Sequence, residues 1–95
     1  MSMYNGWTNY ETWRVNLEML DGSGCEDFGI RIDEDDIDSS SRELASGLES
    51  YCVELVEMDA KGFAVDLALS FLNKVDWQEI ARHMVEDAIS ISHSN

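Results

Sequence analysis

The sequence predicts an all-α fold: a small four-helix bundle with an acidic loop at about residues 21–38 and room there for a short extended segment. Apolar side chains recur at helical spacing in four segments. Three of these segments begin with the capping-box pattern, a Ser, Thr or Asp followed three residues later by Glu. The chain has no proline, and its 95 residues suffice for a single domain. We expect helices at about residues 9–20, 40–58, 62–73 and 76–90.

The first expected helix follows an aromatic stretch. Thr8 and Glu11 form its capping box, and Trp7 stands where an apolar residue can pack back onto the first turn. Two glycines in the segment 21–24 end the helix. Its apolar stripe comprises Tyr10, Trp13, Leu17 and Leu20. Because a small bundle must bury its rings, we expect a core containing Trp7, Tyr10, Trp13 and Trp77.

The segment 25–38 carries few helical signals. Phe28, Ile30 and Ile32 alternate like a short strand, but no second strand pattern is visible, so we expect an extended loop that places these three side chains on the core. The run 33–38 contains five acids in six residues, which is typical of a solvated linker. It does not match a calcium loop, because Asp38 stands where that loop needs glycine and Leu44 where it needs glutamate.

The second expected helix opens with a capping box from Ser40 to Glu43. Gly47 weakens this helix by about 1 kcal/mol relative to alanine, and we expect it to allow close approach of another helix. The acids of the helix should face water. Its inner stripe comprises Leu44, Leu48, Tyr51, Cys52 and Leu55.

The third segment, 63–73, is apolar nearly all round, which predicts a central helix. The fourth begins with a capping box from Asp76 to Glu79, and we expect residues 90–95 to fray. The buried side of this last helix comprises Ile80, Ala81, Met84, Ala88 and Ile89 or Ile91.

Net charge limits the classes of partner that the protein is expected to bind. Twenty acids stand against six bases, giving −14, and the charge is uneven: residues 11–59 hold fifteen acids and three bases, whereas residues 61–95 hold five and three. Such a field repels nucleic acid and anionic membranes and steers the protein toward basic surfaces. There is no membrane-spanning run and no secretory leader, so we expect a cytoplasmic protein. We expect Cys25 and Cys52 to be free thiols there, with a bridge between them as the alternative.

No motif in the sequence combines the residue types that a catalytic site needs. Neither cysteine has a supporting motif, and no partner is spaced to use His83, which we interpret as a surface or helix-packing residue. His93 falls in the expected frayed end. Two histidines and two separated cysteines do not make a zinc pattern. We therefore expect no enzymatic activity, no cofactor and no metal site.

Two blocks carry a family resemblance: GWTNYETWRVNL at residues 6–17, and DLAL at 66–69 with VDWQEIA at 75–81. They resemble the start and end of small uncharacterised proteins of bacteriophages and mobile elements, whereas the middle of the chain departs from that pattern. The resemblance implies a phage protein acting in the bacterial host cell. Small acidic phage proteins often inhibit host defence, as anti-CRISPR or antirestriction proteins do.

Charge and resemblance together predict a non-catalytic inhibitor that occupies a basic nucleic-acid-binding surface of a CRISPR effector subunit, as an acidic partner or DNA mimic. One alternative is an antirestriction DNA mimic; another is a structural or regulatory phage protein that binds through its aromatic motif, with the charge serving solubility. The sequence leaves a homodimer open. The candidate aromatic contacts are Tyr4 and Trp7. The candidate acidic contacts are Glu26, Asp27, Asp33, Glu34, Asp35, Asp36, Asp38, Glu43, Glu49, Glu54 and Glu57.

Overall fold

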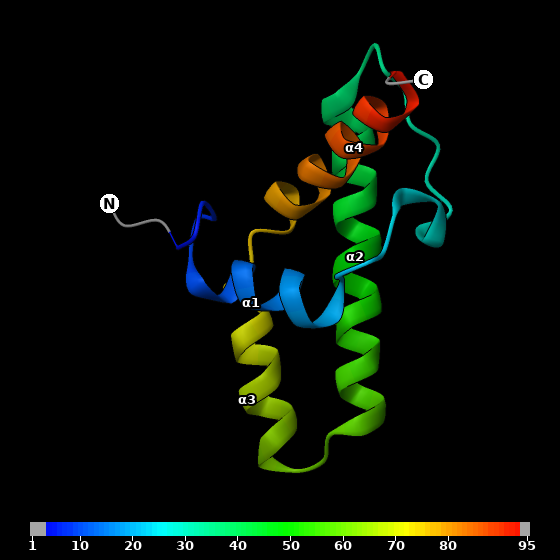
Figure 1. Cartoon of the computed structure of the whole chain (residues 1–95). Coiled ribbons are helices and arrows are strands. Elements are labelled where there is room, and N and C mark those ends of the chain that lie inside the picture. The colour runs from blue at the N-terminus through cyan, green and yellow to red at the C-terminus, as the bar shows by residue number, and fades with distance from the viewer. Residues whose placement is uncertain (1–3, 94–95) are drawn as a thin grey trace.

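The protein is a small all-α four-helix bundle organised on one long helix (Figure 1). The structure is a computed structural model that describes residues 4–93, and side chains up to Ile91. Helix α4 packs along the N-terminal half of α2, α3 lies beside its C-terminal half, and α1 contacts both α3 and α4 near the point where these two helices meet. None of the described helices is long and apolar enough to cross a membrane. The elements are α1 (Tyr10–Met19), the 3₁₀ helix η1 (Cys25–Phe28), α2 (Ile37–Asp59), α3 (Phe63–Leu72) and α4 (Trp77–His93).

The chain enters α1 through a tight turn, and the cap of α1 lies one residue later than predicted. Tyr4 and Trp7 exchange two backbone hydrogen bonds of 2.7 and 2.8 Å around Asn5 and Gly6, which both have positive φ, as a two-residue hairpin turn requires. Asn9 is the N-cap: its side-chain oxygen accepts a hydrogen bond from the Thr12 amide. The predicted Thr8 capping box is therefore wrong, because the Thr8 amide is bonded elsewhere.

The start of α2 also differs from the prediction, by three residues. Asp36 is the N-cap and accepts a 3.0 Å hydrogen bond from the Ser39 amide. Ser40, predicted to open the helix, lies buried in its first turn, where its hydroxyl accepts from the Asp33 amide. Before α2, the expected extended loop contains the helical turn η1. Its apolar side chains do pack on the core as predicted: Phe28, Ile30 and Ile32.

The core lies between α2 and α4. From α2 come Leu44, Leu48 and Cys52, and from α4 Ile80, Ala81 and Val85, each fully buried. This confirms most of the two predicted inner stripes; Val85 is an addition, whereas Ile91 and Tyr51 are exposed, and Tyr51 rests edge-on against Phe28. The remaining core side chains are Val15, Leu20, Cys25, Leu72, Val75 and Trp77.

The aromatic face of α1 points outward. The buried side chains of this helix are Thr12 and Val15, whereas Tyr10 and Leu17 are exposed and Trp13 is half-buried. Trp77 alone of the four expected core rings is in the buried core; Trp7 packs against its edge. The prediction failed because apolar spacing identifies a stripe but not which neighbour, protein or solvent, it faces.

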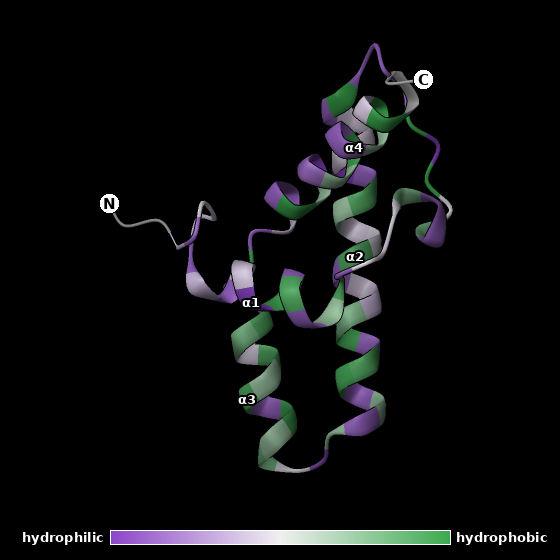
Figure 2. Ribbon diagram, viewed as in Figure 1, coloured by the Kyte–Doolittle hydropathy of each residue, from purple (hydrophilic) through white to green (hydrophobic). Residues whose placement is uncertain are grey.

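Helix α3 is not central, contrary to the prediction. Leu72, at its C-terminal end, is its only buried residue, and Phe63 at its start is 73% exposed. Figure 2 shows apolar residues along α3 and the adjoining end of α2, beyond the reach of α4. The two helices form a helical hairpin that projects from the rest of the molecule (Figure 1).

Gly47 faces η1 across a contact that has room for a methyl group. A Cβ placed there would lie 3.9 Å from the Cβ of Phe28, an ordinary van der Waals distance. Because glycine weakens a helix interior, Gly47→Ala is expected to raise the free energy of unfolding by about 0.5–1 kcal/mol. Urea denaturation followed by circular dichroism measures this, and a loss of stability would show that the Phe28 contact is tighter than it appears.

Candidate functional site

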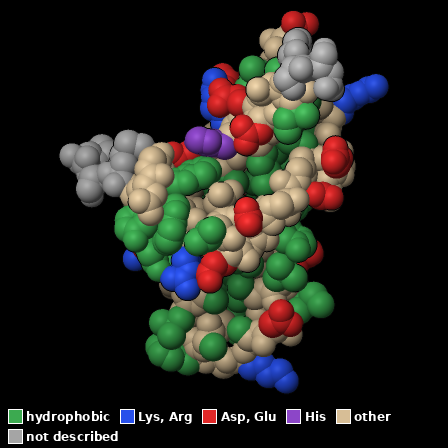
Figure 3. All heavy atoms as spheres, in the orientation of Figure 1, with side chains coloured by type: hydrophobic (Ala, Val, Ile, Leu, Met, Phe, Trp, Pro, Cys, Tyr) green, Lys and Arg blue, Asp and Glu red, His purple; other side chains and the backbone are tan. Residues whose placement is uncertain are grey.

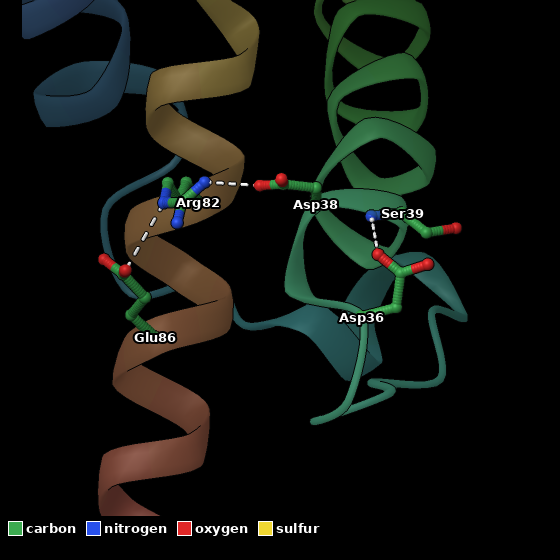
Figure 4. A network of polar contacts seen from close by, with 5 residues as sticks. All are labelled: Asp36, Asp38, Ser39, Arg82 and Glu86. Carbon is green, nitrogen blue, oxygen red and sulfur yellow. Dashed lines mark hydrogen bonds and ion pairs between the residues drawn. The ribbon is translucent and has the colours of Figure 1, made fainter.

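The acidic run 33–38 forms the tip of α2, and part of it has a structural role (Figure 4). Asp36 caps the helix, and a carboxylate oxygen of Asp33 accepts a 2.9 Å hydrogen bond from the Asp35 amide. Negative charge is favourable at a helix N-terminus, where the backbone amides point outward. All five acids of the run remain exposed to solvent. Local structure therefore holds this charge in a fixed place at the end of α2.

Asp38 connects this tip to α4. Its carboxylate pairs with Arg82, which also reaches Glu86 at 3.4 Å, one turn further along α4 (Figure 4). All three side chains are exposed, so the pairs contribute little to stability. Their effect is to neutralise the charge of Asp38 in part.

Two further candidates lie on η1. The Asp27 carboxylate accepts a 2.8 Å hydrogen bond from the Gly24 amide and so closes the 3₁₀ turn. Glu26 beside it is exposed. Both side chains are exposed, and Asp27 in addition stabilises the turn.

The four glutamates of α2 divide between two sides of the helix. At about 100° per residue, Glu43, Glu54 and Glu57 fall within about 60° of one another around the axis, over a rise of about 21 Å. Glu49 points toward α3 instead, where it lines a shallow hollow with Asp66 and Asn73. The helix therefore carries one outward stripe of carboxylates, Glu43, Glu54 and Glu57, which we call the α2 stripe.

The aromatic candidates separate. Tyr4 packs on two rings of α1, with centroid distances of 5.1 Å to Tyr10 and 4.9 Å to Trp13. Trp7 stacks instead on His83 of α4 at 4.5 Å, which confirms the interpretation of His83 as a surface and packing residue. The rings of Tyr4, Tyr10 and Trp13 form an aromatic cluster on the outer side of α1, with Arg14 over the Tyr10 ring.

A polar network that the sequence did not reveal joins the start of α1 to the start of α4. Thr12 is fully buried; its hydroxyl donates to the side-chain oxygen of Asn9 at 2.6 Å and accepts from the Asp76 amide at 2.8 Å. In return, Glu79 accepts a 3.0 Å hydrogen bond from the Thr8 amide, and the Asn9 amide group donates to the Lys74 carbonyl.

Each helix keeps its own N-cap, and the side chain three residues after that cap bonds to the backbone at the start of the other helix. We call this arrangement the exchanged caps. Asp76 accepts from the Glu79 amide, as predicted, but the Glu79 carboxylate reaches the Thr8 amide rather than closing its own box. In the same way, the Thr12 hydroxyl of α1 accepts a hydrogen bond from the amide of Asp76, the residue before α4. The matching three-residue spacing of Asn9 with Thr12 and Asp76 with Glu79 was the available signal, but nothing in the sequence pairs the two sets.

A family model matches residues 1–92, nearly the whole chain. The chain belongs to DUF7249, a family of unknown function. No curated protein and no solved structure matches it. The exchanged caps of this DUF7249 protein join the segments 6–17 and 74–81, so these two distant parts of the chain meet in space and hold one joint of the fold.

The cysteines of the DUF7249 protein are unbonded and buried. Among the described residues, no group of three or more His, Cys, Asp or Glu side chains is placed to hold a metal ion. Burial raises the pKa of the Cys52 thiol to about 11, because a thiolate is poorly solvated in the core.

This pKa predicts a loss of stability at high pH. The folded-state value lies above the unfolded value of about 9, so the stability contributed by Cys52 is complete below pH 9 and is lost as the pH rises through about 11. Two pKa units correspond to about 2–3 kcal/mol. We expect urea midpoints to fall across this range, and Cys52→Ala, which has no thiol to ionise, to show a smaller fall. Equal falls in both proteins would contradict the assignment.

Proposed function

We propose that this DUF7249 protein is a non-catalytic inhibitor that binds a basic, nucleic-acid-binding surface of a host defence complex, with a CRISPR effector subunit as the favoured target. The observation that carries the proposal is the placement of acids on α2. The α2 stripe lies on one continuous helix of 23 residues, and the acidic run 33–38 leads into its N-terminus. Such a helix is about 34 Å long, close to the roughly 34 Å of one turn of duplex DNA.

Rigidity supports this proposal. The carboxylates of the α2 stripe lie on one helix that packs against α4 along its N-terminal half and against α3 along its C-terminal half, so their backbone positions are fixed relative to one another before a partner binds. A basic channel built to neutralise phosphates would meet a pre-arranged negative surface. The resemblance of residues 6–17 to phage proteins gives such a surface a biological setting, and an antirestriction protein aimed at a restriction enzyme is the same physical type.

A second candidate function rests on the aromatic cluster of Tyr4, Tyr10 and Trp13. These rings lie within 4.9–5.8 Å of one another, and both tyrosines are exposed. Tyrosine and tryptophan are enriched among the residues that dominate binding energy. In this alternative, a phage structural or regulatory protein binds its partner through the cluster, and the charge maintains solubility.

The test is a capture experiment with two triple variants of equal charge. The tagged protein is incubated with a lysate that contains CRISPR and restriction machinery, and washed at low and then high salt. Glu43→Gln, Glu54→Gln and Glu57→Gln remove the α2 stripe; Asp66→Asn, Glu86→Gln and Asp87→Asn remove three exposed acids from α3 and α4. Each triple variant changes the formal charge from −14 to −11.

We expect wild type and the α3/α4 variant to recover a basic effector subunit and the α2-stripe variant to lose it. High salt should release the subunit, because the screening length falls from about 10 Å at 0.1 M to about 3 Å at 1 M. Equal loss in both variants would mean that net charge, and not the α2 stripe, drives binding. A partner that survives high salt and both variants but is lost in Tyr10→Ala would favour the aromatic cluster. Recovery of housekeeping proteins alone would overturn the defence proposal.

A further inference from the structure

The projecting hairpin of α2 and α3 exposes an unusually apolar surface. Met58 at the end of α2 is 75% exposed, and Leu67 of α3 is 56% exposed beside the exposed Phe63. In Figure 3, hydrophobic side chains cover much of this lower part of the molecule. Single exposed apolar residues are ordinary, but a contiguous patch of this kind marks an interaction site.

A groove runs through this patch. A hollow of about 410 Å³ lies between α1, α2 and α3, with walls that include Val56, Ala64 and Phe71. A second hollow, of about 290 Å³, shares Met19, Val56 and Ala68 with it, so the two are continuous. Arg14 and Glu18, the charged side chains that line the larger hollow, pair with each other. The larger hollow therefore presents an apolar floor with a paired rim, and Asp59 lines the smaller one.

The protomer is more extended, and has more accessible surface, than a compact monomer of its length. Its radius of gyration is 14.0 Å, against about 12.4 Å for a compact domain of this length. Its accessible surface is 6289 Å², against about 5,500 Å² for a monomer of this mass. The excess is close to the roughly 800 Å² that each partner buries in a standard interface.

We propose that this face binds a second copy of the chain. A helical hairpin is half of a four-helix bundle, and two hairpins related by a two-fold axis complete one. A two-fold interface must be self-complementary, and this face contains both halves of such a contact. Large side chains project from it at Phe63 and Leu67, and small ones, Ala64 and Ala68, floor its groove. In the dimer, the projecting side chains of each protomer fill the groove of the other.

The dimer leaves the α2 stripe outside the interface and does not depend on the proposed inhibitor function. The two contacts also respond oppositely to salt. Each protomer carries a charge of −14, so the copies repel each other at low ionic strength. Added salt screens that repulsion and strengthens the dimer, whereas it weakens an acidic protein on a basic surface.

The test is sedimentation equilibrium of the purified full chain over a range of protein and salt concentrations. Leu67→Glu and Phe63→Glu each place a charge in the interface but on a side chain that is exposed in the protomer, so helicity by circular dichroism should be unchanged. Ile91→Glu is the matched control, an exposed aliphatic side chain at the far end of the molecule.

We expect a dimer for wild type and Ile91→Glu, tighter at high salt, and an increase of about a hundredfold or more in the dimer dissociation constant for both interface variants, because each buries an unpaired charge. A monomeric wild type at every concentration and salt would overturn the proposal and leave the face to a different protein. A dimer unaffected by either interface variant would overturn it too, since association would then use another surface.

Discussion

Replacement of Trp77 by alanine is expected to lower the free energy of unfolding by about 3–5 kcal/mol. Trp77 is the first residue of α4, and its ring is buried in the core with Val75 and Ile80. Deleting a buried ring removes its apolar surface from the core and leaves a cavity that the neighbours fill only in part. Because whole domains are stable by only about 5–15 kcal/mol, much of the protein's stability would be lost. Urea denaturation of both proteins gives the difference.

Trp13→Ala is the matched control for Trp77→Ala. The Trp13 ring is only half-buried and lies in the aromatic cluster on the outside of α1, so less of its surface leaves water on folding than for Trp77. We expect its removal to cost less than half of the Trp77 effect. Equal losses would mean that the aromatic side of α1 is a second core, and would contradict the outward placement of Tyr10 and Trp13.

Thr12→Val is expected to destabilise the protein by about 1–3 kcal/mol although it changes no side-chain shape. The Thr12 hydroxyl is fully buried and links the Asp76 amide to the cap of α1. A methyl group in its place leaves that amide without its partner inside the protein. Valine and threonine have similar helix propensities, so the difference reports the hydroxyl itself. Urea denaturation measures the loss.

Thr8→Val provides the comparison for Thr12→Val. Thr8 is exposed and engages Glu79 through its backbone amide, which the substitution keeps. We expect a change within about 0.5 kcal/mol. The exchanged-cap description would be contradicted if Thr12→Val were as stable as wild type, or if both substitutions cost the same.

Helical periodicity located four helices and most of the α2–α4 core. Side chains such as Leu44 and Leu48 repeat at one helical turn, and the apolar stripe that they form is stable only when it is buried. The helix N-caps were harder to predict. Thr8 and Asn9 are both good N-caps, and a bond from the Thr8 amide to Glu79, 71 residues away, decides between them. Likewise Ser40 suits a cap, but its hydroxyl is taken by Asp33. Local spacing cannot choose among capping residues when tertiary contacts do.

Prediction of the outer surface from the sequence has a similar limit. Exposure of the acids followed from their charge, and 100° periodicity could have separated Glu49 from the α2 stripe before the structure was known. Hydropathy marked α3 as a helix that must be covered, but it could not show that the protomer leaves Phe63 and Leu67 open. The sequence shows that a helix face is apolar. Only the fold shows whether residues of the same chain pack against that face.

The most direct test of the proposed function is an infection assay. A phage targeted by a CRISPR system is plated on cells that express the wild-type chain, the α2-stripe variant or the α3/α4 charge control, beside cells without the targeting spacer and cells that carry a restriction system instead. We predict that wild type and the charge control restore plating on the CRISPR cells and that the α2-stripe variant does not. Restored plating only on restricting cells would redirect the proposal to restriction. Unchanged plating on both, with the protein expressed and folded, would contradict the inhibitor function.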